Sequence, residues 1–186
     1  MQTIYYRTIM KQFLFFLLLG VLLTSGSHAK SKVSVEEVVK ASFKNVSAVE
    51  PKSLILTKAQ FSKVRTEAKA AIKTKVYRYY NIMSKSEKVG VGVLITRKVR
   101  SKKATVLYAF DKKGTLRFTE IMAFGEPPEF IPSPIWMGQL QNQKKTTKLT
   151  VGKDIPTISG STLSARSITE GARIARAIFE IVLESK

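Results

Sequence analysis

The chain has 186 residues and carries 32 lysines and arginines against 13 aspartates and glutamates, a formal charge of +19. It contains no cysteine, and its one histidine stands at position 28. Disulfide bonds, cysteine catalysis and lipidation at a cysteine are therefore excluded. Beyond residue 28 the chain also lacks the usual ligands of zinc, iron-sulfur clusters and covalently attached haem, so we expect no metal site.

Residues 1–29 have the pattern of an export signal. A basic flank precedes an apolar run, residues 13–23, and a small-x-small cleavage site ends at Ala29. The run is shorter than the ~20 apolar residues of a membrane-spanning helix, which favours cleavage over a retained anchor. Met10 is an alternative to Met1 as the start, because a complete signal also follows it. Cleavage removes two basic residues and no acidic ones, which leaves 30 against 13 and a formal charge of +17.

This basic excess points to a polyanionic partner. Nucleic acid is not expected, because the chain is predicted to be exported and its basic residues are scattered along the sequence. An anionic membrane surface or an acidic protein fits better. The alternative is that the charge only keeps the protein in solution.

Two helices are predicted near the start of the mature chain. Ser34 begins a capping box, followed by apolar residues at helical spacing, which predicts a helix to about residue 44. Pro51 interrupts the chain, and Thr57 begins a second capping box, which predicts a helix to about residue 71.

An antiparallel sheet follows these helices. Strand-forming residues and turn signals predict strands over residues 75–82, 89–99, 104–110 and 115–124. The last two flank a DKKG loop that ends in Gly114, the glycine that such hairpins favour. Gly90 and Gly92 leave one face of a strand bare, either for the approach of a planar ligand or at a bulge.

The C-terminal part begins with a stretch that holds four prolines in ten residues, 125–134, and so forbids regular structure. Ser133 followed by Pro134 predicts the start of a short helix to about residue 143. A long last helix is predicted to start at Ser167, the head of a third capping box, or one turn earlier at Ser164. Its expected apolar stripe is Ile168, Ala172, Ala175, Ile178 and Val182, with Glu170–Arg173 and Arg176–Glu180 as expected side-chain pairs.

Together these elements predict an α+β fold: an antiparallel sheet of about four to five strands with N-terminal helices and a long C-terminal helix. We divide the chain into a signal peptide (1–29), an N-terminal helical segment (30–53) and a domain (54–186).

The segment SGSTLS just ahead of the last helix is the best candidate site. A loop of small residues before a helix presents backbone N–H groups and the positive end of the helix dipole to an anion, and hydroxyls add donors. The alternative is an ordinary capped helix start. The candidate residues are Ser159, Gly160, Ser161, Thr162, Leu163 and Ser164.

The stretch SGSTLSARSITEGAR resembles the signature of the FMN-binding domain family, in which Ser/Thr-Gly-Ala-Thr precedes an apolar residue and Ser/Thr. That family includes flavin-carrying components of the sodium-pumping NADH:quinone reductase and of the related Rnf complex, with many small exported proteins. The strand-DKKG-strand region, the Gly125-Glu126-Pro127 loop and LTKAQF (residues 56–61) resemble other parts of the family, in the same order. The resemblance spans roughly residues 54–183.

This resemblance implies an FMN-binding protein of the periplasm or the outer face of the cytoplasmic membrane. Its flavin would pass electrons between envelope redox proteins or a membrane complex. The FMN phosphate would lie at residues 159–164, with Glu126 and Pro127 near the isoalloxazine ring. In several family members a flavin transferase joins the phosphate to the motif threonine, here Thr162, as a phosphoester.

Two positions depart from the pattern of the covalently modified members, which usually have alanine where this chain has Ser161 and aspartate where it has Pro156. Covalent and non-covalent binding of FMN are therefore both left open. No acid-base pair suited to catalysis is visible, which favours a redox carrier over a substrate-converting enzyme.

Weaker alternatives concern the surroundings of the site. The Glu126 loop either approaches the flavin or is only a rigid exit from the sheet. Trp136 and the tyrosines at 77, 79 and 80 either stack on a flavin or belong to the core. A second functional hypothesis is a flavin-free basic module that binds an anionic envelope protein or membrane surface.

Overall fold

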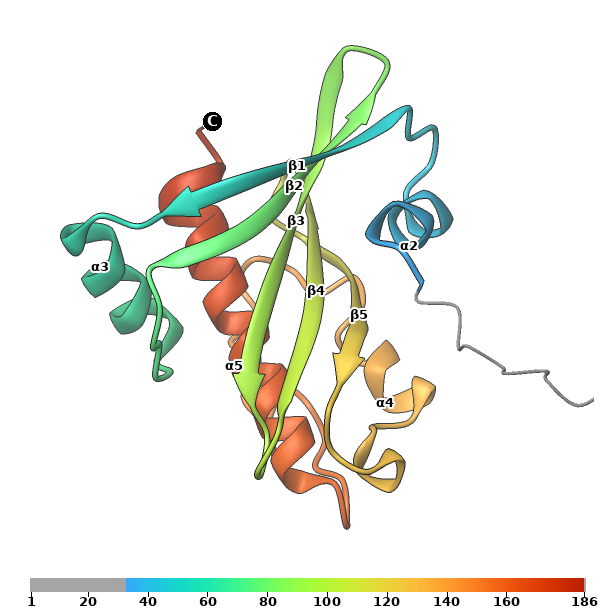
Figure 1. The fold of residues 1–186 in the computed structure, drawn as a ribbon, viewed down its shortest axis with the longest axis vertical. Helices are drawn as coiled ribbons and strands as arrows, with labels where there is room; N and C mark the ends of the chain where they lie inside the picture. Colours follow the sequence, from blue (N-terminus) through green and yellow to red (C-terminus); the bar gives the residue numbers. More distant parts are fainter. Residues whose placement is uncertain (1–32, 186) are drawn as a thin grey trace, which may run out of the picture. The chain divides into compact units, whose positions relative to one another are not determined.

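Five antiparallel strands form one sheet in chain order, β1-β2-β3-β4-β5, in the computed structural model, which describes residues 33–185. The strands are β1 (Ala48–Ile55), β2 (Val76–Ser84), β3 (Glu87–Lys98), β4 (Lys103–Asp111) and β5 (Leu116–Phe124). The α+β fold agrees with the sequence prediction (Figure 1). The predicted signal peptide, with both alternative starts, lies outside the described residues.

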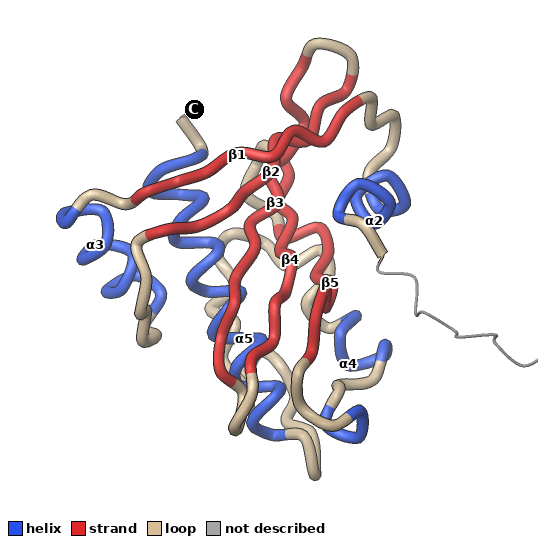
Figure 2. Tube along the Cα trace, in the orientation of Figure 1, coloured by secondary structure: helices blue, strands red, loops and turns tan. Residues whose placement is uncertain are grey.

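Helices cover both faces of the sheet. They are α2 (Val35–Ser42), α3 (Lys58–Ala68), α4 (Pro134–Gly138) and α5 (Thr162–Ile178), with a 3-10 turn η2 (Pro128–Phe130) and a π-helical turn η3 (Phe179–Leu183) that continues α5. Figure 1 shows α5 running along the sheet with α3 beside it. Figure 2 shows in tan the loops that join β5 to α4 and α4 to α5. Among the described residues, no helix combines the length and apolarity needed to cross a membrane.

The prediction that Pro51 interrupts the chain is wrong, because β1 runs through it. Pro51 pairs with Tyr80 of β2, and β1 is the edge strand of the sheet. Proline lacks a backbone N–H, which an edge strand can do without on its unpaired side. β1 also crosses the expected boundary between residues 53 and 54, and the chain from Val33 onward forms one compact unit.

The helix starts of the first half are as predicted. The Ser34 hydroxyl accepts a hydrogen bond from the Glu37 N–H at 3.1 Å, and the Glu37 carboxylate accepts one from the Ser34 N–H at 2.8 Å. Thr57 and Gln60 form the same reciprocal pair at the start of α3. Lys69, in the left-handed region with φ of 46°, ends α3 earlier than expected.

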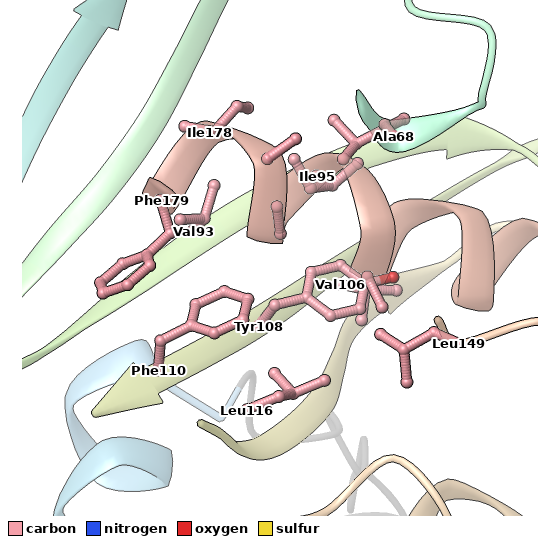
Figure 3. Packing of buried hydrophobic residues seen from close by; sticks show 14 of the residues in the cluster. Ala68, Val93, Ile95, Val106, Tyr108, Phe110, Leu116, Leu149, Ile178 and Phe179 are labelled. Carbon is pink, nitrogen blue, oxygen red and sulfur yellow. The ribbon is translucent and has the colours of Figure 1, made fainter. Parts of the chain in front are cut away.

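The main core lies between α5 and one face of the sheet. Alternate residues of β4 point to this face, namely Val106, Tyr108 and Phe110, and the predicted apolar stripe of α5 is buried against them (Figure 3). The Tyr108 hydroxyl donates a 2.7 Å hydrogen bond to the Ile168 carbonyl. A Cβ on Gly171 would lie 2.3 Å from that hydroxyl, so only glycine lets α5 approach β4 this closely.

The other face of the sheet packs against α2. Phe43 ends α2 and lies over Gly90, where an added Cβ would come within 2.9 Å of its ring. Phe43 also packs edge-on against Phe118, with ring centroids 5.9 Å apart. The register of β2 and β3 shifts beside Gly90. The bare face at Gly90 thus serves a bulge and an aromatic side chain of the chain itself.

Candidate functional site

Three loops meet at the end of the sheet where β3 turns into β4 and α5 begins. They are the β3–β4 turn (99–102), the loop after β5 (125–131) and the hydroxyl loop (158–164). The Ser161 hydroxyl donates to the Glu129 carbonyl at 3.4 Å, and the Ser167 hydroxyl donates to the Lys98 carbonyl at 3.3 Å. These contacts hold the start of α5 against the two other loops, at the lower end of Figure 1.

The last helix begins at Thr162, earlier than either predicted start. Ser161 is its N-cap residue, and its side chain makes no capping hydrogen bond. The predicted capping box at Ser167 is therefore wrong. Ser167 lies inside the helix and is buried, and Glu170 forms an ion pair with Arg97 of β3 instead of reaching back to Ser167. Ser167 packs against the sheet inside α5, and the helix therefore starts at Thr162, two residues after Gly160.

The uncapped start of α5 has consequences for anion binding. The first backbone N–H groups of a helix have no partner within the helix, and here no side chain supplies one. Together with the helix dipole they favour negative charge at this end. Gly160 precedes the helix with φ of 77°, a left-handed conformation that glycine adopts without strain. No described atom outside its immediate neighbours lies within 4 Å of where a Cβ of Gly160 would stand, so the approach to the helix end is open.

Residues 159–164 of the hydroxyl loop differ in exposure. Ser159, Gly160, Thr162 and Leu163 are exposed, whereas Ser161 and Ser164 are buried. Thr162 is the first residue of α5, and its hydroxyl donates to the Ile158 carbonyl at 2.8 Å. That bond uses the Thr162 hydroxyl as a donor and leaves its lone pairs free to accept. Ser164 is only 1% exposed, so its hydroxyl points into the protein rather than to a surface ligand.

Glu126 organises the β3–β4 turn. Its carboxylate accepts hydrogen bonds from the backbone N–H groups of Arg100, Ser101 and Lys102 at 2.9, 2.6 and 2.7 Å, and from the Ser101 hydroxyl at 3.2 Å. The bond from Lys102, assisted by those from Arg100 and Ser101, lowers the pKa of the Glu126 carboxyl. The carboxylate oxygens of Glu126 are therefore already bonded within the protein. This is what we expect if the Glu126 loop serves as a rigid exit from the sheet. Pro127 follows it and is exposed.

The aromatic candidates are part of the core. Trp136 and Tyr77 are 6% and 8% exposed. The Trp136 ring N–H donates to the Pro156 carbonyl at 2.8 Å, which fixes the chain ahead of the hydroxyl loop. Any residue at position 156 would offer this backbone carbonyl, so the bond does not depend on the proline ring.

Sequence reasoning missed two arginines at this end of the molecule. Arg166 is exposed and follows Thr162 by four residues in α5, so the two side chains share one helix face. The Arg100 guanidinium lies 4.5 Å from the centre of the Phe130 ring, a cation–π contact between the turn and the loop after β5. The i, i+4 spacing of Thr162 and Arg166 was the available signal, and it becomes meaningful only when the helix starts at Thr162.

The hydroxyl loop does not line the cavity of about 390 Å³ described below. Within residues 33–185 no cluster of three or more acidic, histidine or cysteine side chains is placed to hold a metal ion. No protein-family model matches the chain, and no curated protein is similar enough to count as a relative.

Proposed function

We propose that the protein is an exported flavoprotein that holds FMN by its phosphate at the start of α5 and carries electrons between redox partners in the cell envelope. The observation that carries the proposal is the exposed Thr162 at the uncapped first turn of a 17-residue helix. The resemblance to the FMN-binding domain family supports FMN as the ligand.

The residues of this end fit a flavin phosphate. The free N–H groups of the first turn and the helix dipole would stabilise its charge. Arg166 offers a cation on the same helix face, and Arg100 lies on the neighbouring turn. Leu163 is 44% exposed, which gives a flat ring an apolar contact beside the phosphate. FMN itself supplies the one- or two-electron chemistry, while the protein supplies position and electrostatics.

Covalent attachment is part of the proposal, and it requires an activated flavin phosphate and a flavin transferase. The Thr162 oxygen would bond to phosphorus, the bond from phosphorus to its leaving group would break, and the hydroxyl proton would pass to solvent. The hydrogen bond to the Ile158 carbonyl would then be lost. The surrounding N–H groups would stabilise the charge that develops on the phosphoryl oxygens.

The test is to produce the protein with a flavin transferase and excess flavin, then to record its visible spectrum before and after acid denaturation. We expect flavin absorbance that stays with the denatured chain and that disappears in Thr162→Ala. Thr157→Ala is the matched control, because Thr157 is an exposed threonine of the same connection. Purified protein without any flavin absorbance would contradict the proposal.

A second candidate function is a flavin-free basic module that binds an anionic envelope protein or membrane. The observation in its favour is the exposed β3–β4 turn with its flanks, in which Lys98, Arg100, Lys102 and Lys103 form no ion pair within the described part of the chain. This function predicts retention on anionic vesicles that weakens steeply with salt. Bound flavin together with salt-insensitive behaviour would exclude it.

A further inference from the structure

A cavity of about 390 Å³ lies at the opposite end of α5 from the hydroxyl loop. It is bounded by the end of α3, by the connection 145–150 and by the last turns of α5. Fourteen residues separate Thr162 from Arg176 along the helix. At 1.5 Å per residue the two positions are about 21 Å apart, so this cavity is separate from the proposed flavin site.

The charge of the cavity wall is unbalanced. Five basic side chains face two carboxylates: the wall includes Lys69, Lys145, Lys148, Arg173 and Arg176 with Glu67 and Glu180. Lys145 has a partner, because its ammonium group contacts both carboxylate oxygens of Glu184 at 2.8 and 2.9 Å. Lys69 and Lys148 are exposed and form no ion pair with any described residue. Three hydroxyl donors, from Thr146, Thr147 and Thr150, complete the polar wall.

Arg176 is the unusual member of this wall. It is 8% exposed, and its Nη1 donates to the backbone carbonyls of Thr147 and, at 3.4 Å, Lys145. Its other two nitrogens, Nε and Nη2, are buried and have no hydrogen-bond partner among the described residues. Glu180 lies four residues on but does not come within ion-pair distance. Burial lowers the pKa of Arg176, which shows how little water screens the group.

A guanidinium buried with two unpartnered nitrogens is costly unless nearby negative charge offsets it. Neutral carbonyls at Nη1 offset it only partly. The Glu180 carboxylate offsets part of this charge without forming an ion pair, and an anion held by Lys69 and Lys148 in the adjoining cavity would offset more of it. Native proteins seldom leave buried polar groups without a partner. We therefore expect the compensating anion in the cavity beside Arg176.

The walls of the cavity are held in place by the other arginine. Arg173 Nε donates to the Ala68 carbonyl at 2.8 Å, and its Nη1 donates to the Leu149 carbonyl at 3.0 Å. Leu149 is buried and has φ of 54°, and Lys69 has φ of 46°. Non-glycine residues keep this left-handed conformation only when their surroundings enforce it. Arg173 therefore joins α3 and the 145–150 connection into a preformed frame.

We propose that this cavity binds a phosphate-bearing small anion. The ammonium groups of Lys69 and Lys148 and the threonine hydroxyls can contact phosphate oxygens directly, and the buried charge of Arg176 attracts the anion from within the wall. The volume lies in the range of small-molecule sites, which suits a phosphorylated metabolite or a phospholipid headgroup. The two carboxylates lower the affinity of the cavity for an anion, because they repel its negative charge.

The test uses inorganic pyrophosphate as the probe and the mature chain prepared without flavin. Amide chemical shifts are followed by NMR at about 150 mM salt, where non-specific attraction to scattered lysines is weakened. We expect saturable shifts at Thr147 and Lys148. Lys69→Gln with Lys148→Gln should weaken binding about tenfold. The matched control, Lys58→Gln with Lys63→Gln on exposed positions of α3, should change it less than about twofold.

Glu180→Gln gives a change of the opposite sign. Removing this carboxylate from the wall should tighten pyrophosphate binding about threefold, a result that loss of structure cannot produce. The proposal is overturned if shifts do not saturate, if the control pair weakens binding as much as the cavity pair, or if Glu180→Gln weakens it.

Vesicles separate the two sources of phosphate. Lipid vesicles that contain phosphatidic acid carry an exposed phosphate monoester, and vesicles with phosphatidylserine at equal charge do not. Selective binding to the first, lost in the Lys69→Gln/Lys148→Gln variant, identifies a lipid headgroup. Pyrophosphate binding without that selectivity identifies a soluble phosphorylated molecule. In either case the proposal requires saturable pyrophosphate binding, and the vesicles decide only between the two sources.

Discussion

The two ends of α5 are built in opposite ways. The C-terminal half is tied to its neighbours by two arginines, and Arg173 caps the carbonyls at the end of α3 while holding Leu149 in place. At the N-terminal turn no described side chain makes a capping hydrogen bond, and Thr162 and Arg166 are exposed. At the C-terminal half, arginines donate to backbone carbonyls of neighbouring segments. At the N-terminal end, the first backbone N–H groups of α5 are left without a capping side chain among the described residues.

This difference indicates which substitutions should affect folding and which should affect binding. Where backbone polar groups are already paired, losing a partner destabilises the fold. Where they face solvent, water replaces a missing side chain and the fold is little changed. The predictions below test this division and the packing between the two ends, from the largest expected effect on stability to the smallest.

Arg173→Met and Arg166→Met compare the two halves directly. Arg173→Met removes the donors to the Ala68 and Leu149 carbonyls, and we expect a loss of about 3 kcal/mol in the free energy of unfolding. Arg166→Met should change it by less than about 0.5 kcal/mol, because Arg166 is exposed and forms no hydrogen bond or ion pair with the described residues. Denaturant unfolding measures both, and equal losses would contradict the division.

Gly171→Ala tests the contact that holds the middle of α5 on the sheet. The added Cβ would lie 2.3 Å from the Tyr108 hydroxyl and 3.0 Å from its ring carbon, in a core with no room for the ring to move. Overpacking outweighs the better helix propensity of alanine, and we expect a net loss of about 2 kcal/mol.

Tyr108→Phe in the Gly171→Ala background removes the clashing oxygen. The double variant should be less destabilised than the sum of the two single variants, since the hydrogen bond to Ile168 and the clash involve the same atom. Strict additivity in denaturant unfolding would show that Gly171 is not required for this approach.

Glu126→Gln should flatten the acid limb of the stability curve. Hydrogen bonds from the turn lower the pKa of Glu126 in the folded state, so its contribution is present above the ordinary value of about 4.3 and is lost as pH falls through the lowered one. Thermal unfolding between about pH 2 and about pH 7 measures the slope. Glu129→Gln is the control, because the Glu129 side chain is exposed and makes no described hydrogen bond. An unchanged slope in Glu126→Gln would contradict the anchoring role.

Thr162→Ala should have the smallest effect on folding. Its hydroxyl bonds only to the Ile158 carbonyl, at an exposed position, so the free energy of unfolding should fall by less than about 0.5 kcal/mol. Differential scanning calorimetry measures this value. A loss near about 2 kcal/mol, the size expected of a structural contact, would make Thr162 a structural residue and weaken its claim as a flavin site.

The sequence predicted the elements whose signals are local. The capping boxes at Ser34 and Thr57, the hairpin glycine Gly114 and the apolar stripe of α5 depend on neighbours in the chain, and the structure has all of them. The contact between the Ser161 hydroxyl and the Glu129 carbonyl, which brings the loop after β5 beside the hydroxyl loop, had no local signal in the sequence.

Features set by tertiary contacts were not predictable. Ser167 and Glu170 have the pattern of a capping box, but packing against β3 buries the serine and gives the glutamate to Arg97. The structure also lacks the expected ion pairs of Glu170 with Arg173 and of Arg176 with Glu180 among the described residues. Arg173 donates instead to the Ala68 carbonyl, and Arg176 donates to the Thr147 carbonyl. A pattern that fits a local motif does not reveal a stronger partner elsewhere in the fold.

The central proposal is that the protein is exported and carries FMN on Thr162, and the intact mass of the native protein tests it most directly. We expect the mass of the chain after cleavage plus the increment of one FMN joined as a phosphoester, and the mass of the bare chain for Thr162→Ala. A native protein that has the bare-chain mass, or a Thr162→Ala variant that keeps the increment, would contradict the claim.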